Sequence, residues 1–145
     1  MCRFTSVLWV LICSSLLLAE GGKSDAEAIQ GKWNVVSAVY SGKAAKNEEN
    51  EKDGLGFWTI NKTQIVYSEK SLADYMLNTA KKPKEIDATH PAAANQTAET
   101  LLGIYELEGD QLRICIARSG SPRPTKFESA AESKTNLIVL KRVKP

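Results

Sequence analysis

The sequence predicts an all-β domain, an eight-stranded antiparallel up-and-down β-barrel with a short helix on its N-terminal side. Eight short runs rich in β-branched and aromatic residues follow one another, each bounded by turn-forming residues. Most connections between them are short, which leaves room only for antiparallel neighbours. The tripeptide Gly31-Lys32-Trp33 opens the first run and Lys141-Arg142 closes the last, so a tryptophan and a cation would meet where first and last strands pair.

Residues 1–21 are predicted to form a signal peptide. Arg3 provides a basic head, an apolar stretch runs from Val7 to Ala19, and Ala19-Glu20-Gly21 matches a small-x-small cleavage pattern. The apolar stretch is well short of the roughly 20 residues that a membrane-spanning helix needs. We therefore expect an exported protein, periplasmic or extracellular, with residues 22–145 as its domain and no membrane span after cleavage.

Charge and cysteine content narrow the classes of function. The chain of 145 residues has a formal net charge of +2 with its cations spread along the sequence, so we expect no nucleic-acid partner. Cleavage would leave Cys115 as the one cysteine of the mature domain, which excludes an intrachain disulfide there. Apolar burial can hold together a domain of this size. We expect one domain and a monomer.

Each element has its own local signal. Residues 24–30 begin with a serine suited to an N-cap, continue with acids and alanines, and stop at Gly31, which predicts one or two helical turns. Gly109 suits the left-handed conformation of a bulged turn at 108–110. Residues 41–55 and 118–134 are predicted to be long loops over the ends of the barrel. The strands are predicted at 32–40, 56–60, 64–68, 72–78, 85–89, 100–107, 111–117 and 136–142.

The two free edges of the predicted sheet indicate that it closes into a barrel. Antiparallel strands in sequence order leave two unpaired edges, and pairing the first strand with the last removes both. An eight-stranded barrel is just wide enough to be filled by its own side chains or to hold one small ligand. The sequence leaves these two alternatives open.

Several motifs together resemble a known superfamily. Gly31-Lys32-Trp33, the following Val35-Val36-Ser37, the meander and the basic residue of the last strand are similar to the calycins, which include lipocalins and fatty-acid-binding proteins. More closely, nearly the whole mature chain resembles an uncharacterised lipocalin-like domain family of planctomycete bacteria. The residues that carry this closer resemblance are 102–107, 109–110, 112–115, 122–124 with Phe127, and 137–142.

The resemblance to calycins implies a structural role for the two ends of the domain. Trp33 would pack in the closed end of a lipocalin-like barrel, beneath a cation from the last strand. Arg142 is the better partner, because a guanidinium stacks on an indole while also donating to carbonyl groups. Gly31, Trp33 and Arg142 are therefore expected to close the barrel.

Candidate ligand contacts come from the face that Trp33 would share. Alternation places Val35 and Ser37 on the same face of the first strand, and this face points inward if Trp33 does. A cavity lined by such side chains would accept a small apolar or amphipathic molecule, with a tyrosine available for a hydrogen bond. The ligand-binding candidates are Trp33, Val35, Ser37, Tyr67, Tyr105, Ile114 and Arg123.

Arg123 is a candidate because it stands between Pro122 and Pro124. Two prolines restrict the backbone, so the guanidinium could be presented to a carboxylate or a phosphate. The alternative is a rigid loop whose arginine caps the mouth of the barrel.

Chemistry-bearing residues are few. His90 is the one histidine, which excludes a multi-histidine zinc site, and its place before Pro91 predicts an exposed turn residue. Cys115 stands between Ile114 and Ile116, where a thiol is usually a small buried hydrophobe. We therefore predict no catalytic residue, no metal site and no cofactor.

Two hypotheses for function follow. The first is an exported, non-enzymatic lipocalin-like barrel that binds a small hydrophobic or amphipathic ligand. The alternative is a filled barrel that contacts another protein, as an interaction or inhibitor-like module, through its two long loops. A cavity of about 300 Å³ or more behind the loops distinguishes the first from the second.

Overall fold

A computed structural model describes residues 22–45, 56–68 and 71–145. The predicted signal peptide, most of the predicted loop at 41–55 and residues 69–70 lie outside this part of the chain. Within it, no helix is long and apolar enough to cross a bilayer.

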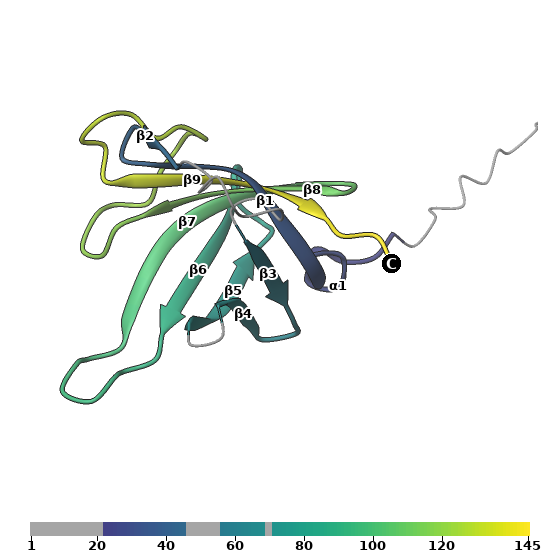
Figure 1. Ribbon diagram of the computed structural model, residues 1–145, viewed down its shortest axis with the longest axis horizontal. Helices are drawn as coiled ribbons and strands as arrows, with labels where there is room; N and C mark the ends of the chain where they lie inside the picture. The colour runs from purple at the N-terminus through teal and green to yellow at the C-terminus, as the bar shows by residue number, and fades with distance from the viewer. Residues whose placement is uncertain (1–21, 46–55, 69–70) are drawn as a thin grey trace, which may run out of the picture.

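One antiparallel sheet closes on itself into a barrel (Figure 1). Its strands follow in chain order, and β1 also pairs with β9, from Trp33 opposite Arg142 to Tyr40 opposite Asn136. The predicted closure of the meander is thus confirmed. The elements are α1 (Asp25–Ala28), β1 (Gly31–Tyr40), β2 (Lys43–Ala44), β3 (Phe57–Ile60), β4 (Gln64–Ser68), β5 (Ser71–Asn78), β6 (Lys84–His90), β7 (Glu99–Glu108), β8 (Gln111–Ala117) and β9 (Thr135–Arg142).

The eight predicted strands are all present, and their ends differ from the prediction by no more than one residue. The short β2 was not predicted. It pairs with the end of β1 through a tight turn in which Ser41 and Gly42 have φ of 47° and 82°. Two successive positive φ values are typical of the turn that best fits the twist of a hairpin. Gly109, with φ of 55°, takes the predicted left-handed conformation.

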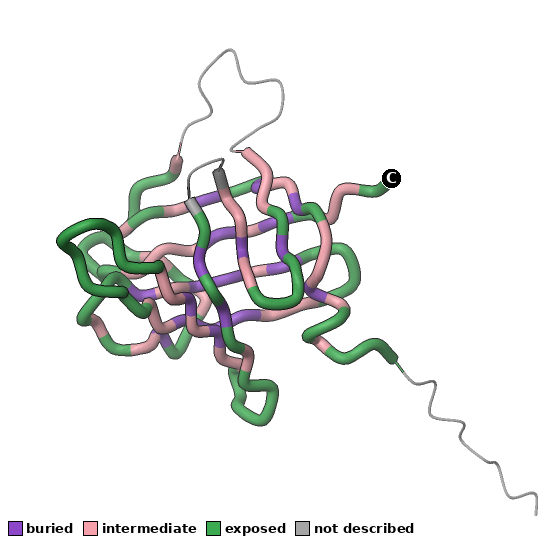
Figure 2. The backbone as a smooth tube through the Cα atoms, turned by 90° about the horizontal axis from the view of Figure 1, so that it is seen from below, coloured by how far each residue is buried: buried purple, intermediate pink, exposed green. Residues whose placement is uncertain are grey.

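A β-bulge changes which side chains of β1 face inward. Val35 lies opposite Leu140 and Ser37 opposite Val139, so Val36 is an extra residue without a partner on β9. Alternation restarts after it, and Ala38 is buried whereas Ser37 is exposed. The prediction that Ser37 shares the inner face of Trp33 and Val35 is therefore wrong. Along β5 and β6 buried positions alternate with more exposed ones. Figure 2 shows buried positions between more exposed ones along the strands of the barrel.

The helix α1 closes one end of the barrel, and the C-terminus lies beside it (Figure 1). The Trp33 indole is fully buried and donates from Nε1 to the carbonyl of Ile29 at 2.8 Å. The Arg142 guanidinium lies 4.2 Å from the centre of the Trp33 ring and donates to the carbonyls of Gln30 and Ala28. The contact expected between Trp33 and Arg142 is thus present and joins the first and last strands. We call this half of the barrel the closed half.

Asp25 ties α1 to the barrel wall. Its Oδ2 accepts hydrogen bonds from Lys84 Nζ at 2.7 Å and from the Tyr105 hydroxyl at 2.6 Å. Burial alone would raise the pKa of Asp25, but these two hydrogen bonds and the charge of Lys84 lower it below its ordinary value. Burial and the Asp25 carboxylate both raise the pKa of Tyr105. The closed half is thus sealed by polar as well as apolar contacts.

The long connection at 118–134 packs against the outside of the barrel. Its Arg123 pairs with Asp87 of β6 at 2.6 Å and donates to the carbonyl of Gly103 in β7 at 2.7 Å. Beneath the same connection Cys115 is fully buried, and its thiol donates to the carbonyl of Glu128. The expectation of a loop over the barrel end is wrong for Arg123 and Glu128, because their partners lie on the outside of β6, β7 and β8. Further along the connection, Ser129 accepts a hydrogen bond from the backbone of Gly42 in the β1–β2 turn.

Candidate functional site

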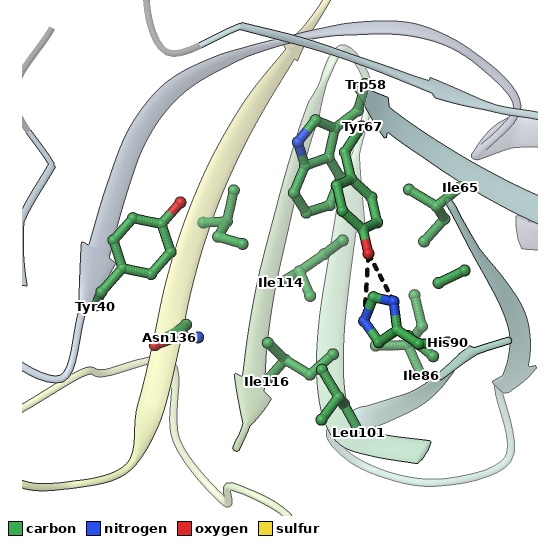
Figure 3. A pocket seen from close by; sticks show the side chains of 13 residues that line it. Tyr40, Trp58, Ile65, Tyr67, Ile86, His90, Leu101, Ile114, Ile116 and Asn136 are labelled. Atoms are coloured by element: carbon green, nitrogen blue, oxygen red, sulfur yellow. Dashed lines mark hydrogen bonds between the residues drawn. The ribbon is translucent and has the colours of Figure 1, made fainter. Parts of the chain in front are cut away.

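The half of the barrel away from α1 is hollow. We call it the open half, and it holds a cavity of about 340 Å³ (Figure 3). This volume is at the lower end of the range of about 300–1,000 Å³ that is typical of small-molecule sites. The lining residues are Tyr40, Trp58, Ile65, Tyr67, Ala73, Ile86, Ala88, His90, Leu101, Ile114, Ile116, Asn136 and Ile138.

Aliphatic side chains form most of the cavity wall. They come from β4 to β9 at inward positions, so the two-residue period of the strands builds the wall directly. Ala73 and Ala88 are small and leave space in the middle of the barrel, whereas Trp33 and Tyr105 occupy the corresponding space in the closed half. The barrel is therefore filled at one end and hollow at the other.

An aromatic cluster forms one side of the cavity. The Tyr67 hydroxyl lies 2.7 Å from Nδ1 of His90, and the two rings meet edge to face at 83° (Figure 3). The Trp58 ring is tilted against Tyr67, with their ring centres 5.8 Å apart. Burial raises the pKa of Tyr67, so its hydroxyl stays protonated at neutral pH.

Tyr40 and Asn136 lie across the cavity from this cluster, with isoleucine side chains between the two groups (Figure 3). They are directly paired in β1 and β9. Tyr40 reaches the inner side because the bulge at Val36 shifts the alternation of β1 by one residue. Hydrogen-bonding groups thus stand on two opposite sides of an apolar cavity.

Two of the predicted ligand contacts, Tyr67 and Ile114, line the cavity. Trp33 and Val35 face inward but are buried in the core and do not line it. Tyr105 is likewise buried in the closed half, and its hydroxyl is bound to Asp25 rather than free for a ligand.

Arg123 also lies away from the cavity. It forms ion pairs with Glu85 and Asp87, whose side chains are on the outer face of β6. The hydrogen bond to Asp87 is the main reason that the pKa of Arg123 is raised. Its neighbouring prolines therefore position an anchor on the outside of the barrel, and Arg123 is not among the described residues that line the cavity.

His90 was predicted to be an exposed turn residue, and the structure corrects this. It is the last residue of β6, half-buried, and its imidazole lines the cavity. Ile86, Ala88 and His90 are spaced two residues apart, and this alternation could have identified His90 as an inward-facing residue of the strand. The predicted strand ended one residue too early.

The described residues contain no group of three or more His, Cys, Asp or Glu side chains that could hold a metal ion. Cys115 is buried outside the barrel interior, and burial raises the pKa of its thiol. Comparison with known proteins found no matching family model, curated protein or solved structure.

Proposed function

We propose that this protein is an exported, non-enzymatic barrel that binds a small hydrophobic or amphipathic molecule in its open half. The observation that carries the proposal is the cavity of about 340 Å³, apolar along its wall and polar at two places. Export rests on the predicted signal peptide at residues 1–21.

The cavity has the chemistry of a binding site for one small apolar molecule. Transfer of apolar surface from water into such a site contributes about 25 cal/mol for each Å² that is buried. Tyr67, His90, Tyr40 and Asn136 can then orient the ligand through hydrogen bonds. A small aromatic molecule or a short acyl chain fits this volume. The hollow interior favours ligand binding over the filled-barrel interaction module.

Titration with N-phenyl-1-naphthylamine, a neutral apolar dye that fluoresces when it leaves water, tests the proposal. The variant Ala88→Phe adds a ring to the inward face of β6, where Ala88 lines the cavity. We expect dye affinity to fall by at least about tenfold, a loss of about 1.4 kcal/mol. The control is Met76→Phe, which adds the same ring on the outer side of β5, where Met76 is 76% exposed. Equal affinities for the two variants would refute binding inside the barrel.

A further inference from the structure

A second hollow adjoins the cavity at His90. It has a volume of about 720 Å³ and is lined by the connection between β6 and β7, by the start of β7 and by Ser119. His90 lines both hollows. On β7 the wall changes from Leu101 in the cavity to Thr100 and Glu99 in the second hollow. We call the second hollow the polar groove.

The polar groove differs from the cavity in chemistry. Its surface is solvent-exposed and consists mainly of amide and hydroxyl side chains. Such groups both donate and accept hydrogen bonds and are suited to uncharged polar partners, above all to hydroxyl groups. The residues that line the groove are His90, Pro91, Asn95, Gln96, Thr97, Ala98, Glu99, Thr100 and Ser119.

The charges around the two hollows disfavour an anionic ligand. None of the 13 described residues that line the cavity is an Asp, Glu, Lys or Arg. Glu99 is the charged side chain of the groove among the residues described there, and it would repel a carboxylate or a phosphate. Burial of an unpaired carboxylate in the cavity would be costly as well.

We infer that the ligand is a neutral amphiphile with a hydroxyl-rich head, a conclusion that rests on the proposed function. Its apolar tail lies in the cavity among the isoleucines, and its head lies in the polar groove. His90, held by Tyr67 at 2.7 Å, stands at the junction of the two parts.

Three probes with the same eight-carbon tail test this inference: octyl glucoside, octanoate and octyltrimethylammonium. Each is titrated calorimetrically into the full protein at pH 7.5, below its micelle concentration. We expect octyl glucoside to bind at least about tenfold more tightly than either charged probe. Hydrogen bonds from the groove to the sugar hydroxyls provide this difference.

Variants of the groove separate recognition of the head from burial of the tail. Gln96 and Thr97 are exposed, so their replacement leaves the barrel intact. The double variant Gln96→Ala, Thr97→Ala should bind octyl glucoside about five- to tenfold more weakly and octanoate unchanged. Gln111→Ala is the matched control, because Gln111 is exposed at the closed end of β8 and should leave all affinities unchanged.

The outcomes distinguish this inference from the proposed function. If N-phenyl-1-naphthylamine binds but octanoate binds as tightly as octyl glucoside, the inference is wrong and the proposed function stands. The same holds if all three probes bind equally or if the groove variants bind octyl glucoside like the control. If neither the dye nor any probe binds, the proposed function itself fails.

Discussion

Trp33 and Trp58 are directly paired across β1 and β3, yet their surroundings differ. Trp33 is fully buried and bonded to the backbone of the closed half, whereas Trp58 is half-buried and lines the cavity. The boundary between the filled and the hollow part of the barrel therefore passes between two neighbouring indoles. Structural and candidate binding roles are separated at this point.

The Arg142 side chain of β9 joins the first and last elements at the closed end. It contacts the Trp33 ring and two carbonyls next to α1, so its removal leaves three groups without their partner. We expect Arg142→Met to lower the free energy of unfolding by about 2–3 kcal/mol, measured by urea denaturation. The neighbouring Lys141→Met, at an exposed position, should change it by less than about 0.5 kcal/mol. Equal effects of both variants would show that the contact does not stabilise the barrel.

Asp25 should make stability depend on pH in the acid range. Its pKa is lowered in the folded state from an ordinary value of 3.8, so the ionised carboxylate stabilises the fold. This contribution is complete above about pH 4 and is lost as the pH falls through the lowered pKa. At pH 7 we expect Asp25→Asn to be less stable than the native protein by about 1–2 kcal/mol.

Measurement of the same pair at acid pH provides the control. As the pH falls through the lowered pKa of Asp25, the carboxylate of the native protein becomes protonated, so the difference in unfolding free energy should shrink progressively. A difference that stays constant from neutral to acid pH would contradict the role given to the ion pair with Lys84.

The connection at 118–134 contains no helix or strand and is nevertheless firmly anchored. Arg123 fixes it to β6 and β7, and the Arg113 guanidinium lies 4.7 Å from the ring centre of Phe127. Pro124 of this connection is buried, and so is Cys115 of β8 beneath it. The connection therefore covers a small apolar cluster on the outside of the barrel, separate from the main core.

Alkylation of the buried Cys115 thiol reports whether Arg123 holds this connection in place. In the variant Arg123→Ala we expect iodoacetamide to modify Cys115 at least about tenfold faster, because local opening exposes the thiol. Mass spectrometry of the peptide that contains Cys115 gives the rate. Arg118→Ala removes an exposed arginine from the same connection and should leave the rate unchanged. Unchanged rates in both variants would refute the anchoring role of Arg123.

For the whole molecule, the order and closure of the eight barrel strands could be predicted because they follow from local signals, whereas the short β2 was not predicted. Turn residues fix the hairpins, and the two free edges of a meander require that first and last strands pair. The helix before Gly31 could be predicted for the same reason, from its N-cap and its alanines.

The candidate site could be predicted only in part, because its position depends on contacts between distant residues. The bulge at Val36 turns Ser37 outward and Tyr40 inward. No local signal in the sequence predicts this bulge. The position of the cavity depends on where large and small side chains meet across the barrel. The order and pairing of the strands do not reveal this. The anchoring role of Arg123, predicted as a ligand contact or a cap over the mouth, could not be foreseen because its acidic partners on β6 lie far from it in the sequence.

A methyl NMR titration with N-phenyl-1-naphthylamine tests most directly whether a ligand enters the open half alone. Isoleucine δ1-methyl groups are present in both halves of the barrel and on its outside. We expect shifts at the cavity residues Ile65, Ile86, Ile114, Ile116 and Ile138, and none at Ile29, Ile60 and Ile104. Shifts at Ile29 and Ile60 with unchanged cavity signals, or no shift at any isoleucine, would contradict a barrel that is sealed at one end and binds its ligand at the other.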